Sequence, residues 1–564
     1  MQNKIILKGL FFIICFILVS NTITSQTVYT RYWVGFTDKT ASLYSISNPS
    51  AYLSARAISR RTSQSIAITN EDIPVNATYI QQVTSTGALV KSRSRWFNGV
   101  LVEITNPSQI TAINALSCVQ STRPLARVRG VKKIIPAQPN VTASERTQAT
   151  QSDVYNYGQS QNQIYMLNGE CLHNKGYNGT GMQIAVIDEG FYGAPGVTVF
   201  DSLWHNHQVI ATHDFYLNDS LNYNNAVLGG HGTYVLSCMA AYTSGQMIGT
   251  APKAKYYLLR SEIDSTEKIV EVYQWVSAIE YADSAGVDVV TSSLGYSQFL
   301  DTTQSFTWGN LNGRTAVASI SATMAARRGM IVCVAAGNEG GCTAVGDPNC
   351  CINNACWEKI TVPADADSII TVGAVDASKN YASFSSVGNT ADGRIKPDVA
   401  AQGLNTTIAN SSGITTGSGT SFATPTMAGM VACLWQGNPA KTNMQVINAI
   451  KQSASQYVSP DSLLGYGIPD FCVADQILKG TLGIQSVANN MINTLCGNMD
   501  CELTVTIYDV SGRMVLSTQT KSSQNNTPDK ILQSLNLSAL SGGMYVVKIT
   551  SNNGNCYTKK VVKY

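Results

Sequence analysis

Short apolar runs rich in β-branched residues alternate with amphipathic stretches through the centre of the chain, from about residue 164 to 480. The runs are MQIAVIDEG, KYYLLRSE, VDVVTSSLG, GMIVCVAAGN and SIITVGAV, with helical patterns such as STEKIVEVYQWVSAIEYADSAG between them. Strands that are apolar throughout are typical of parallel sheets buried on both faces. The pattern predicts an α/β domain with a parallel β-sheet flanked by helices. Polar residues beyond the carboxyl ends of its strands are the first candidates for a site.

The regions on either side of this block have different patterns. Residues 26–136 mix strand patterns such as YWVGF and NGVLVEI with the helical NPSAYLSARAISRR, and predict a compact α+β domain. Residues 137–163 are polar and rich in Gln, Ser and Thr, which predicts an exposed linker. Residues 481–564 alternate polar and apolar positions between Ser-Gly and Gly-Gly turns, which predicts a small β-sandwich.

The first 25 residues have the pattern of a secretory signal peptide. Lys4 and Lys8 precede an apolar run from Leu10 to Val19, and small polar residues follow. A membrane anchor is the alternative, but the run is shorter than the roughly 20 residues that a spanning helix needs. The pattern therefore favours export, with cleavage near Ser25. No other stretch approaches membrane-spanning length.

Composition narrows the classes of partner. The 564 residues are 44% hydrophobic and 13% charged, with a formal net charge of +3. These values are typical of a globular chain that is poor in charge. The near-balanced charge and the lack of a long basic run give no reason to expect nucleic acid or an anionic membrane as a partner.

The 14 cysteines divide into groups with different expected states. Cys15 leaves with the signal peptide. The stretch GCTAVGDPNCCINNACW has four cysteines that we expect to form disulfides in a surface loop; a zinc site is the alternative, but paired C-x-x-C spacing and a nearby His are missing. The four are Cys342, Cys350, Cys351 and Cys356. Three others lie in apolar runs and are predicted to be buried free thiols: Cys238, Cys333 and Cys433.

Four polar residues near the ends of apolar runs together suit acyl transfer. Asp188 ends IAVIDEG, His231 stands in GGHGTYVLSCMA, and Ser421 lies in GSGTSFATPTMAG. Each alone has a simpler reading as a cap or turn residue. Together, an imidazole can take the proton of the serine hydroxyl while a carboxylate holds the imidazole in one tautomer. Asn338, in VAAGNEG, could donate its amide to the oxyanion of a tetrahedral intermediate.

Five motifs in a fixed order resemble the subtilisin-like serine proteases, the subtilase family: AVIDEG, GGHGTYV, AAGNEG, GRIKPDVAAQG and GTSFATP. The resemblance covers about 300 residues and has the subtilisin order of Asp, His and Ser. It implies a subtilisin-like fold over residues 164–480. It also implies Asp188 as the orienting carboxylate, His231 as general base and then acid, Ser421 as nucleophile, and Asn338 with the Ser421 backbone N–H as oxyanion donors.

The same resemblance suggests where a substrate lies. Ser293, Leu294 and Gly295, in SSLGY, match the strand end that pairs with a peptide, and Gly337 matches the far wall of the specificity pocket. Ordinary strand ends are the alternative for these residues. Calcium is common in the family, but no cluster of carboxylates identifies a site in this sequence, and the chemistry requires no cofactor and no metal ligand.

Two positions depart from the pattern of the family. Glu189 follows Asp188 where a small hydroxyl residue is more usual, and Gln402 replaces a usual proline in KPDVAAQG. Neither is expected to touch a catalytic atom.

The two flanking regions also resemble parts of secreted subtilases. Residues 26–136 resemble an inhibitory propeptide, with an accessory binding domain as the alternative. Residues 481–564 resemble the C-terminal sorting domain of the Bacteroidetes type IX secretion system, with a carbohydrate- or protein-binding β-sandwich as the alternative. The resemblance implies passage through the outer membrane, followed by release or attachment at the cell surface.

The hypothesis from sequence is therefore a secreted serine endopeptidase that acts on proteins or peptides. Its expected partners are its own propeptide, as an intramolecular inhibitor, and the type IX secretion machinery. Two other hypotheses stay open: a catalytically idle subtilase fold that serves as a surface binding module, and a processing protease of narrow specificity.

Overall fold

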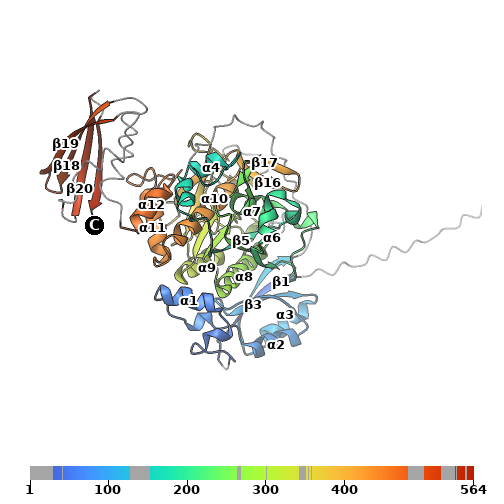
Figure 1. Cartoon of the computed structure of the whole chain (residues 1–564). Coiled ribbons are helices and arrows are strands. Elements are labelled where there is room, and N and C mark those ends of the chain that lie inside the picture. The colour runs from blue at the N-terminus through green and yellow to red at the C-terminus, as the bar shows by residue number, and fades with distance from the viewer. Residues whose placement is uncertain are drawn as a thin grey trace, which may run out of the picture.

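A seven-stranded parallel sheet forms the centre of the molecule (Figure 1). The computed structural model describes residues 30–127, 153–480 and 501–563, except for gaps at 41, 263–267, 300, 342–350, 353–354, 357, 523–539, 541–542 and 553–555. The strand order is β15-β14-β11-β10-β5-β9-β6, and each neighbouring pair is parallel. The bounds are Gln183–Asp188 (β5), Val209–Asp214 (β6), Lys255–Arg260 (β9), Val289–Ser292 (β10), Ile331–Ala335 (β11), Ile370–Val375 (β14) and Val399–Gln402 (β15).

Helices cover both faces of this sheet because its strands are apolar on both sides. Ile184 and Val186 of β5 pack in one core with residues of α7 and α10, whereas Ala185 and Ile187 pack in another core with residues of α8 and α9. This confirms the predicted parallel sheet flanked by helices. The helices are Gln161–Tyr165 (α4), Gly169–Asn174 (α5), Asp201–His205 (α6), His231–Ala240 (α7), Ile269–Ala285 (α8), Val317–Arg327 (α9), Thr420–Gln436 (α10), Asn443–Ser453 (α11) and Phe471–Leu478 (α12).

Three two-stranded sheets complete this part of the chain. They pair β7 with β8, β12 with β13, and β16 with β17, all antiparallel. Their bounds are Tyr242–Thr243 (β7), Met247–Ile248 (β8), Cys351–Ile352 (β12), Ala355–Cys356 (β13), Thr406–Asn410 (β16) and Gly413–Gly417 (β17). The β16-β17 hairpin leads directly into α10.

The N-terminal region is an α+β unit, as its sequence predicts. Four antiparallel strands in the order β2-β3-β1-β4 form its sheet. The strands are Thr30–Phe36 (β1), Leu89–Ser94 (β2), Gly99–Ile104 (β3) and Val119–Arg127 (β4), and the helices are Ala55–Ser63 (α1), Ala77–Ser85 (α2) and Pro107–Asn114 (α3). Its own apolar core includes Val34, Val100 and Ile113.

Buried charged groups join this unit to helix α8. The Asp283 carboxylate of α8 accepts hydrogen bonds from Arg60 at 2.5 Å, from Arg61 at 2.8 Å, and from Arg95. One helical turn earlier, Glu280 accepts from the backbone N–H of Arg95 at 2.8 Å and from the hydroxyl of Ser94. Burial alone would raise the pKa of Asp283, but the three guanidinium groups outweigh it and hold the pKa below its ordinary value.

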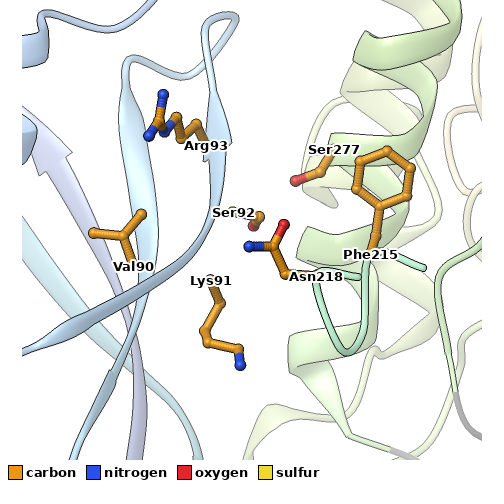
Figure 2. A pocket seen from close by; sticks show the side chains of 7 residues that line it. All are labelled: Val90, Lys91, Ser92, Arg93, Phe215, Asn218 and Ser277. Atoms are coloured by element: carbon orange, nitrogen blue, oxygen red, sulfur yellow. The ribbon is translucent and has the colours of Figure 1, made fainter. Parts of the chain in front are cut away.

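A cavity of about 230 Å³ lies at the same junction (Figure 2). Figure 2 shows Val90 and Arg93 of β2 on one side, and Phe215, just after β6, with Ser277 of α8 on the other. A second cavity, of about 400 Å³, lies beside α9 and is lined by Arg314, among others. Neither cavity contains a site residue that the sequence predicts.

The described part of the C-terminal region is one four-stranded antiparallel sheet, which lies apart from the central sheet and its helices in Figure 1. Its order is β19-β18-β20-β21, with bounds Cys501–Asp509 (β18), Met514–Ser522 (β19), Gly543–Ser551 (β20) and Cys556–Lys563 (β21). The predicted antiparallel β region is present. The second layer of a sandwich is not among the residues that the structure describes.

The cysteines show a pairing that the sequence left open. Cys171 of α5 and Cys472 of α12 form a disulfide, 301 positions apart in sequence. The three cysteines predicted to be free and buried are so: Cys238, Cys333 and Cys433. The predicted signal peptide, the linker up to residue 152, and Cys342 and Cys350 of the cysteine-rich loop lie outside the described residues.

None of the helices in the described ranges is long and apolar enough to cross a membrane.

Candidate active site

The structure brings two of the predicted residues into direct contact at one end of the sheet. Asp188 is the last residue of β5 and is completely buried, and His231 is the first residue of α7. Nδ1 of His231 lies 2.8 Å from Oδ1 of Asp188. A carboxylate at this distance accepts the Nδ1–H and keeps Nε2 as the basic nitrogen.

Ser421 lies in the first turn of α10, which begins at Thr420. The next residue, Phe422, packs its ring against the His231 ring, with centroids 5.9 Å apart. Ser421 lies at the same end of the sheet as Asp188. The hydroxyl of Ser293, just after β10, donates a hydrogen bond to the carbonyl oxygen of Ser421 at 2.8 Å. Ser421 itself is buried, with 8% of its surface exposed.

Pro425 explains why the carbonyl of Ser421 accepts a hydrogen bond from Ser293 rather than from its own helix. In an α-helix the carbonyl of residue i accepts a hydrogen bond from the N–H of residue i+4. Pro425 stands four residues after Ser421 inside α10 and has no N–H to donate. The Ser293 hydroxyl supplies the missing donor, and so ties the start of α10 to the end of β10.

Asn338, three residues after β11, is held by the residue that precedes Ser421. Its Oδ1 accepts from the backbone N–H of Thr420 at 2.8 Å and from the Thr420 hydroxyl at 2.9 Å. Of the two polar atoms of the Asn338 amide, only the oxygen can accept from a backbone N–H, so this contact fixes the orientation of the amide. The Nδ2 donor then lies on the side of Gly419, 3.6 Å from the place where a Cβ of Gly419 would be.

The four predicted substrate-binding residues lie around the same strand ends. The Leu294 side chain is buried in the core of α8 and α9, so only its backbone could meet a peptide. A Cβ at Gly295 would lie 2.1 Å from the Thr361 hydroxyl, and one at Gly337 would lie 2.4 Å from a Glu339 carboxylate oxygen. Both positions therefore require glycine, and Gly337 has a φ of +112° that also favours it.

Sequence patterns did not single out Arg260, which lies beside this site. Arg260, the last residue of β9, is completely buried and lies beside Asp188 in the sheet register. Its Nη1 donates to Asp214 at 2.6 Å, and its Nε donates to the backbone carbonyl of Glu189 at 2.6 Å. The apolar run KYYLLRSE indicated only a strand. The signal that could have drawn attention to this position is an Arg that directly follows the apolar YYLL segment.

Glu189 is closer to the site than its sequence context suggested. Its Oε1 accepts a hydrogen bond from the backbone N–H of His231 at 3.1 Å. Sequence patterns did not predict this contact to the main chain of His231.

Other nucleophilic and metal-binding groups near the site can be assessed from the described residues. Burial raises the pKa of Cys238, in α7, to about 12, so it stays a neutral thiol at neutral pH. Within the described ranges, no group of three or more His, Cys, Asp or Glu side chains is arranged to hold a metal ion.

Comparison with known proteins assigns the family. The profile of the subtilase family matches residues 179–467, about half of the chain, and the chain belongs to this family of serine peptidases. Subtilisin E of Bacillus subtilis (strain 168) is 30% identical over 317 residues, which cover 56% of this chain and 70% of that protein. A subtilisin of Bacillus pumilus is also 30% identical over 317 residues and is covered to 98%.

The flanking regions match two further profiles. Residues 31–140 match the peptidase S8 propeptide domain of Bacteroidota, and residues 488–564 match a secretion system C-terminal sorting domain. The chain thus has an N-terminal propeptide domain and a C-terminal signal for export to the cell surface or beyond. Among solved structures, the MycP3 protease of a type VII secretion system is 21% identical, with a TM-score of 0.42, over 56% of this chain and 87% of that one.

Proposed function

We propose that this chain is an exported serine endopeptidase that cleaves peptide bonds through an acyl-enzyme. The observation that carries the proposal is the 2.8 Å contact between Nδ1 of His231 and the buried Asp188 carboxylate, at the sheet end where the α10 turn with Ser421 begins. This contact leaves the other imidazole nitrogen as the base that the chemistry needs.

The proposed reaction has two halves. His231 takes the proton of the Ser421 hydroxyl as Oγ attacks the peptide carbonyl, and the C–N bond then breaks while His231 gives that proton to the leaving amine. Water attacks the ester by the same route, returns its proton to Ser421 through His231, and releases the acid. Asp188 keeps the imidazole in the required tautomer.

Asn338 is the proposed donor to the oxyanion, together with the backbone N–H of Ser421. Support comes from the two hydrogen bonds that commit its Oδ1 to Thr420, since they leave the Nδ2 hydrogens as its remaining polar group. We expect Asn338→Ala to lower kcat about 100- to 1,000-fold with little change in KM. Asn206→Ala, a change of the same residue type at an exposed position after α6, is the matched control and should keep its activity.

The substrate is proposed to lie along the strand ends that carry Ser293 to Gly295 and Gly337. Extended peptides bind such edges through main-chain hydrogen bonds, and pockets for side chains then give selectivity. The N-terminal propeptide domain is proposed to inhibit the enzyme until it is removed, and the sorting domain is proposed to use type IX secretion machinery.

The decisive experiment compares wild type, Ser421→Ala and Ser412→Ala on casein, after removal of the propeptide. Wild type and the exposed-serine control Ser412→Ala should cleave casein and be labelled by a fluorophosphonate. Ser421→Ala should lose both properties, with activity reduced by at least about 10⁴-fold. If wild type is neither active nor labelled, the endopeptidase proposal fails, and the idle subtilase fold becomes the hypothesis to test.

A processing protease of narrow specificity is a finer form of the same proposal. A peptide-library cleavage profile separates the two: cleavage at many sequences indicates a broad enzyme, and cleavage at one short motif indicates a processing enzyme.

A further inference from the structure

The carboxylate of Glu189 caps the helix that begins with His231. The N-cap residue of α7 is Gly230, which has no side chain to accept a hydrogen bond from the first turn. Oε1 of Glu189 acts as the capping acceptor instead, because it accepts a hydrogen bond from the backbone N–H of His231 at 3.1 Å. A Cβ at Gly229 would lie only 2.9 Å from the same oxygen, so the carboxylate sits directly against the turn that enters α7.

A buried ion pair fixes the backbone on both sides of this contact. Nε of Arg260 donates to the carbonyl of Glu189 at 2.6 Å and to the carbonyl of Leu228 at 3.1 Å. Glu189 follows Asp188, and Leu228 precedes the turn into α7. Arg260 therefore ties the loop that follows Asp188 to the loop that precedes His231, while Asp214 compensates its charge.

The position of His231 gives the negative charge of Glu189 a chemical effect. The N-terminus of a helix carries a partial positive charge, which disfavours a cation placed there. His231 is the first residue of α7, and in the proposed reaction it becomes an imidazolium twice per turnover. A carboxylate at the same helix end offsets that partial charge and favours the protonated imidazole.

We propose that Glu189 is a positioning residue of the proposed peptidase: it fixes the start of α7 so that His231 faces Asp188, and its charge keeps the imidazole basic. This inference rests on the proposed function for its effect on turnover. The charged groups that contact His231 in the described part of the chain include Asp188 and Glu189, from β5 and its following loop, and the Arg260–Asp214 pair from β9 and β6 lies behind them. From α10, Phe422 faces the ring, and it is uncharged.

Two variants separate the geometry from the charge. Glu189→Gln keeps a side-chain oxygen that can accept from His231 N–H, but it removes the negative charge. It should keep kcat at the pH optimum and KM within about twofold, whereas the acid limb of kcat/KM should move by about half a pH unit to lower pH. Glu189→Ala also removes the acceptor, and its kcat should fall about 10- to 100-fold because the base is misplaced.

Asp201→Asn is the matched control, since Asp201 is an exposed carboxylate in the first turn of another helix, α6. It should leave both the acid limb and kcat unchanged. Rates are divided by the concentration of sites that a fluorophosphonate labels, so that a loss of folded protein does not count as a loss of rate. An unmoved acid limb in Glu189→Gln, or an unchanged kcat in Glu189→Ala, would overturn the proposal.

A measurement without turnover keeps this inference separate from the proposed function. In the full chain with Ser421→Ala, NMR of the histidine rings gives the pKa of His231 directly. Adding Glu189→Gln should lower that pKa by about half a unit, and adding Asp201→Asn should not. If wild type proves inactive, the proposed function fails while this titration still decides whether Glu189 sustains the basicity of His231.

Discussion

Helices α8 and α10 are both 17 residues long and are both largely buried, on opposite faces of the same sheet, but they are buried in different ways. Every residue of α10 from Thr420 to Trp435 is buried and none is charged. Helix α8 buries Glu280 and Asp283 under arginines of the propeptide domain. The contact inside the catalytic domain is thus apolar, whereas the contact with the propeptide domain adds buried ion pairs to the apolar packing of Trp96, Leu101 and Leu125. A charged surface can return to water, so the second contact suits a partner that leaves.

Of the changes that test this contrast, Asp283→Ala should have the largest effect on stability. The change leaves the buried guanidinium groups of Arg60, Arg61 and Arg95 without their shared carboxylate, which costs about 3–5 kcal/mol for a buried pair. Hydrogen exchange of α1 amides in the full chain with Ser421→Ala should show the loss of stability at the propeptide contact. Protection of the α10 amides from hydrogen exchange should change much less. An equal loss of protection in α1 and α10 would contradict the contrast between the two contacts.

A shortened side chain in the core around α10 should lower the free energy of unfolding nearly as much. This loss should not depend on pH. Met427 is completely buried in the apolar core, and Met427→Ala should lower the free energy of unfolding by about 2–5 kcal/mol. Urea unfolding at pH 6 and at pH 8 should give the same loss. Met514→Ala, at an exposed position of β19, is the control and should change little.

The contact through α8 should instead weaken as the pH rises. Burial raises the pKa of Glu280 to about 7, against the opposing effect of Arg95, while an exposed Glu has a pKa near 4.5. A group with a raised pKa contributes its full stability below the unfolded value and loses it as the pH rises through about 7. From pH 6 to pH 8 the loss should be roughly 1 kcal/mol.

Thermal unfolding of the full chain with Ser421→Ala tests this pH dependence. Its midpoint should be lower at pH 8 than at pH 6, and adding Glu280→Gln should remove most of that difference. A midpoint that rises between pH 6 and pH 8 would show that other groups govern the contact, such as Asp72, whose pKa is lowered in the folded chain.

The smallest loss of stability should come from a pair at the edge of the contact between the propeptide domain and the catalytic domain. Arg56 pairs with Asp288, but 38% of the Arg56 side chain is exposed. Solvent screens such pairs, so Arg56→Ala should cost less than about 1 kcal/mol in the same hydrogen-exchange measurement. A cost as large as that of Asp283→Ala would mean that burial does not set the strength of these pairs.

Local patterns were enough to predict the sheet and its helices. Continuous apolar runs such as GMIVCVAAGN became central strands because both faces of the sheet are covered. Asp188 and His231 were predicted from their places at the ends of such runs, and the structure brings them together. The positions of the substrate-binding residues relative to a peptide stay a prediction.

Local sequence patterns could not predict contacts between distant parts of the chain. Ser293 meets the carbonyl of Ser421 only because Pro425 lacks an N–H, and no local pattern links positions 128 apart. Arg260 looked like the end of a strand, although it ties two loops of the site together. The arginines on Asp283 belong to ordinary helical and strand patterns, and their meeting depends on how the two domains pack.

The disulfide between Cys171 and Cys472 turns the catalytic domain into a covalent ring. The propeptide domain and the predicted linker lie before Cys171, and the sorting domain lies after Cys472. Proteolysis in either tail would therefore release that tail and leave the ring closed. A single cut inside the ring would leave both pieces joined, so the unit that carries Asp188, His231 and Ser421 can be trimmed at both ends and nicked once without coming apart.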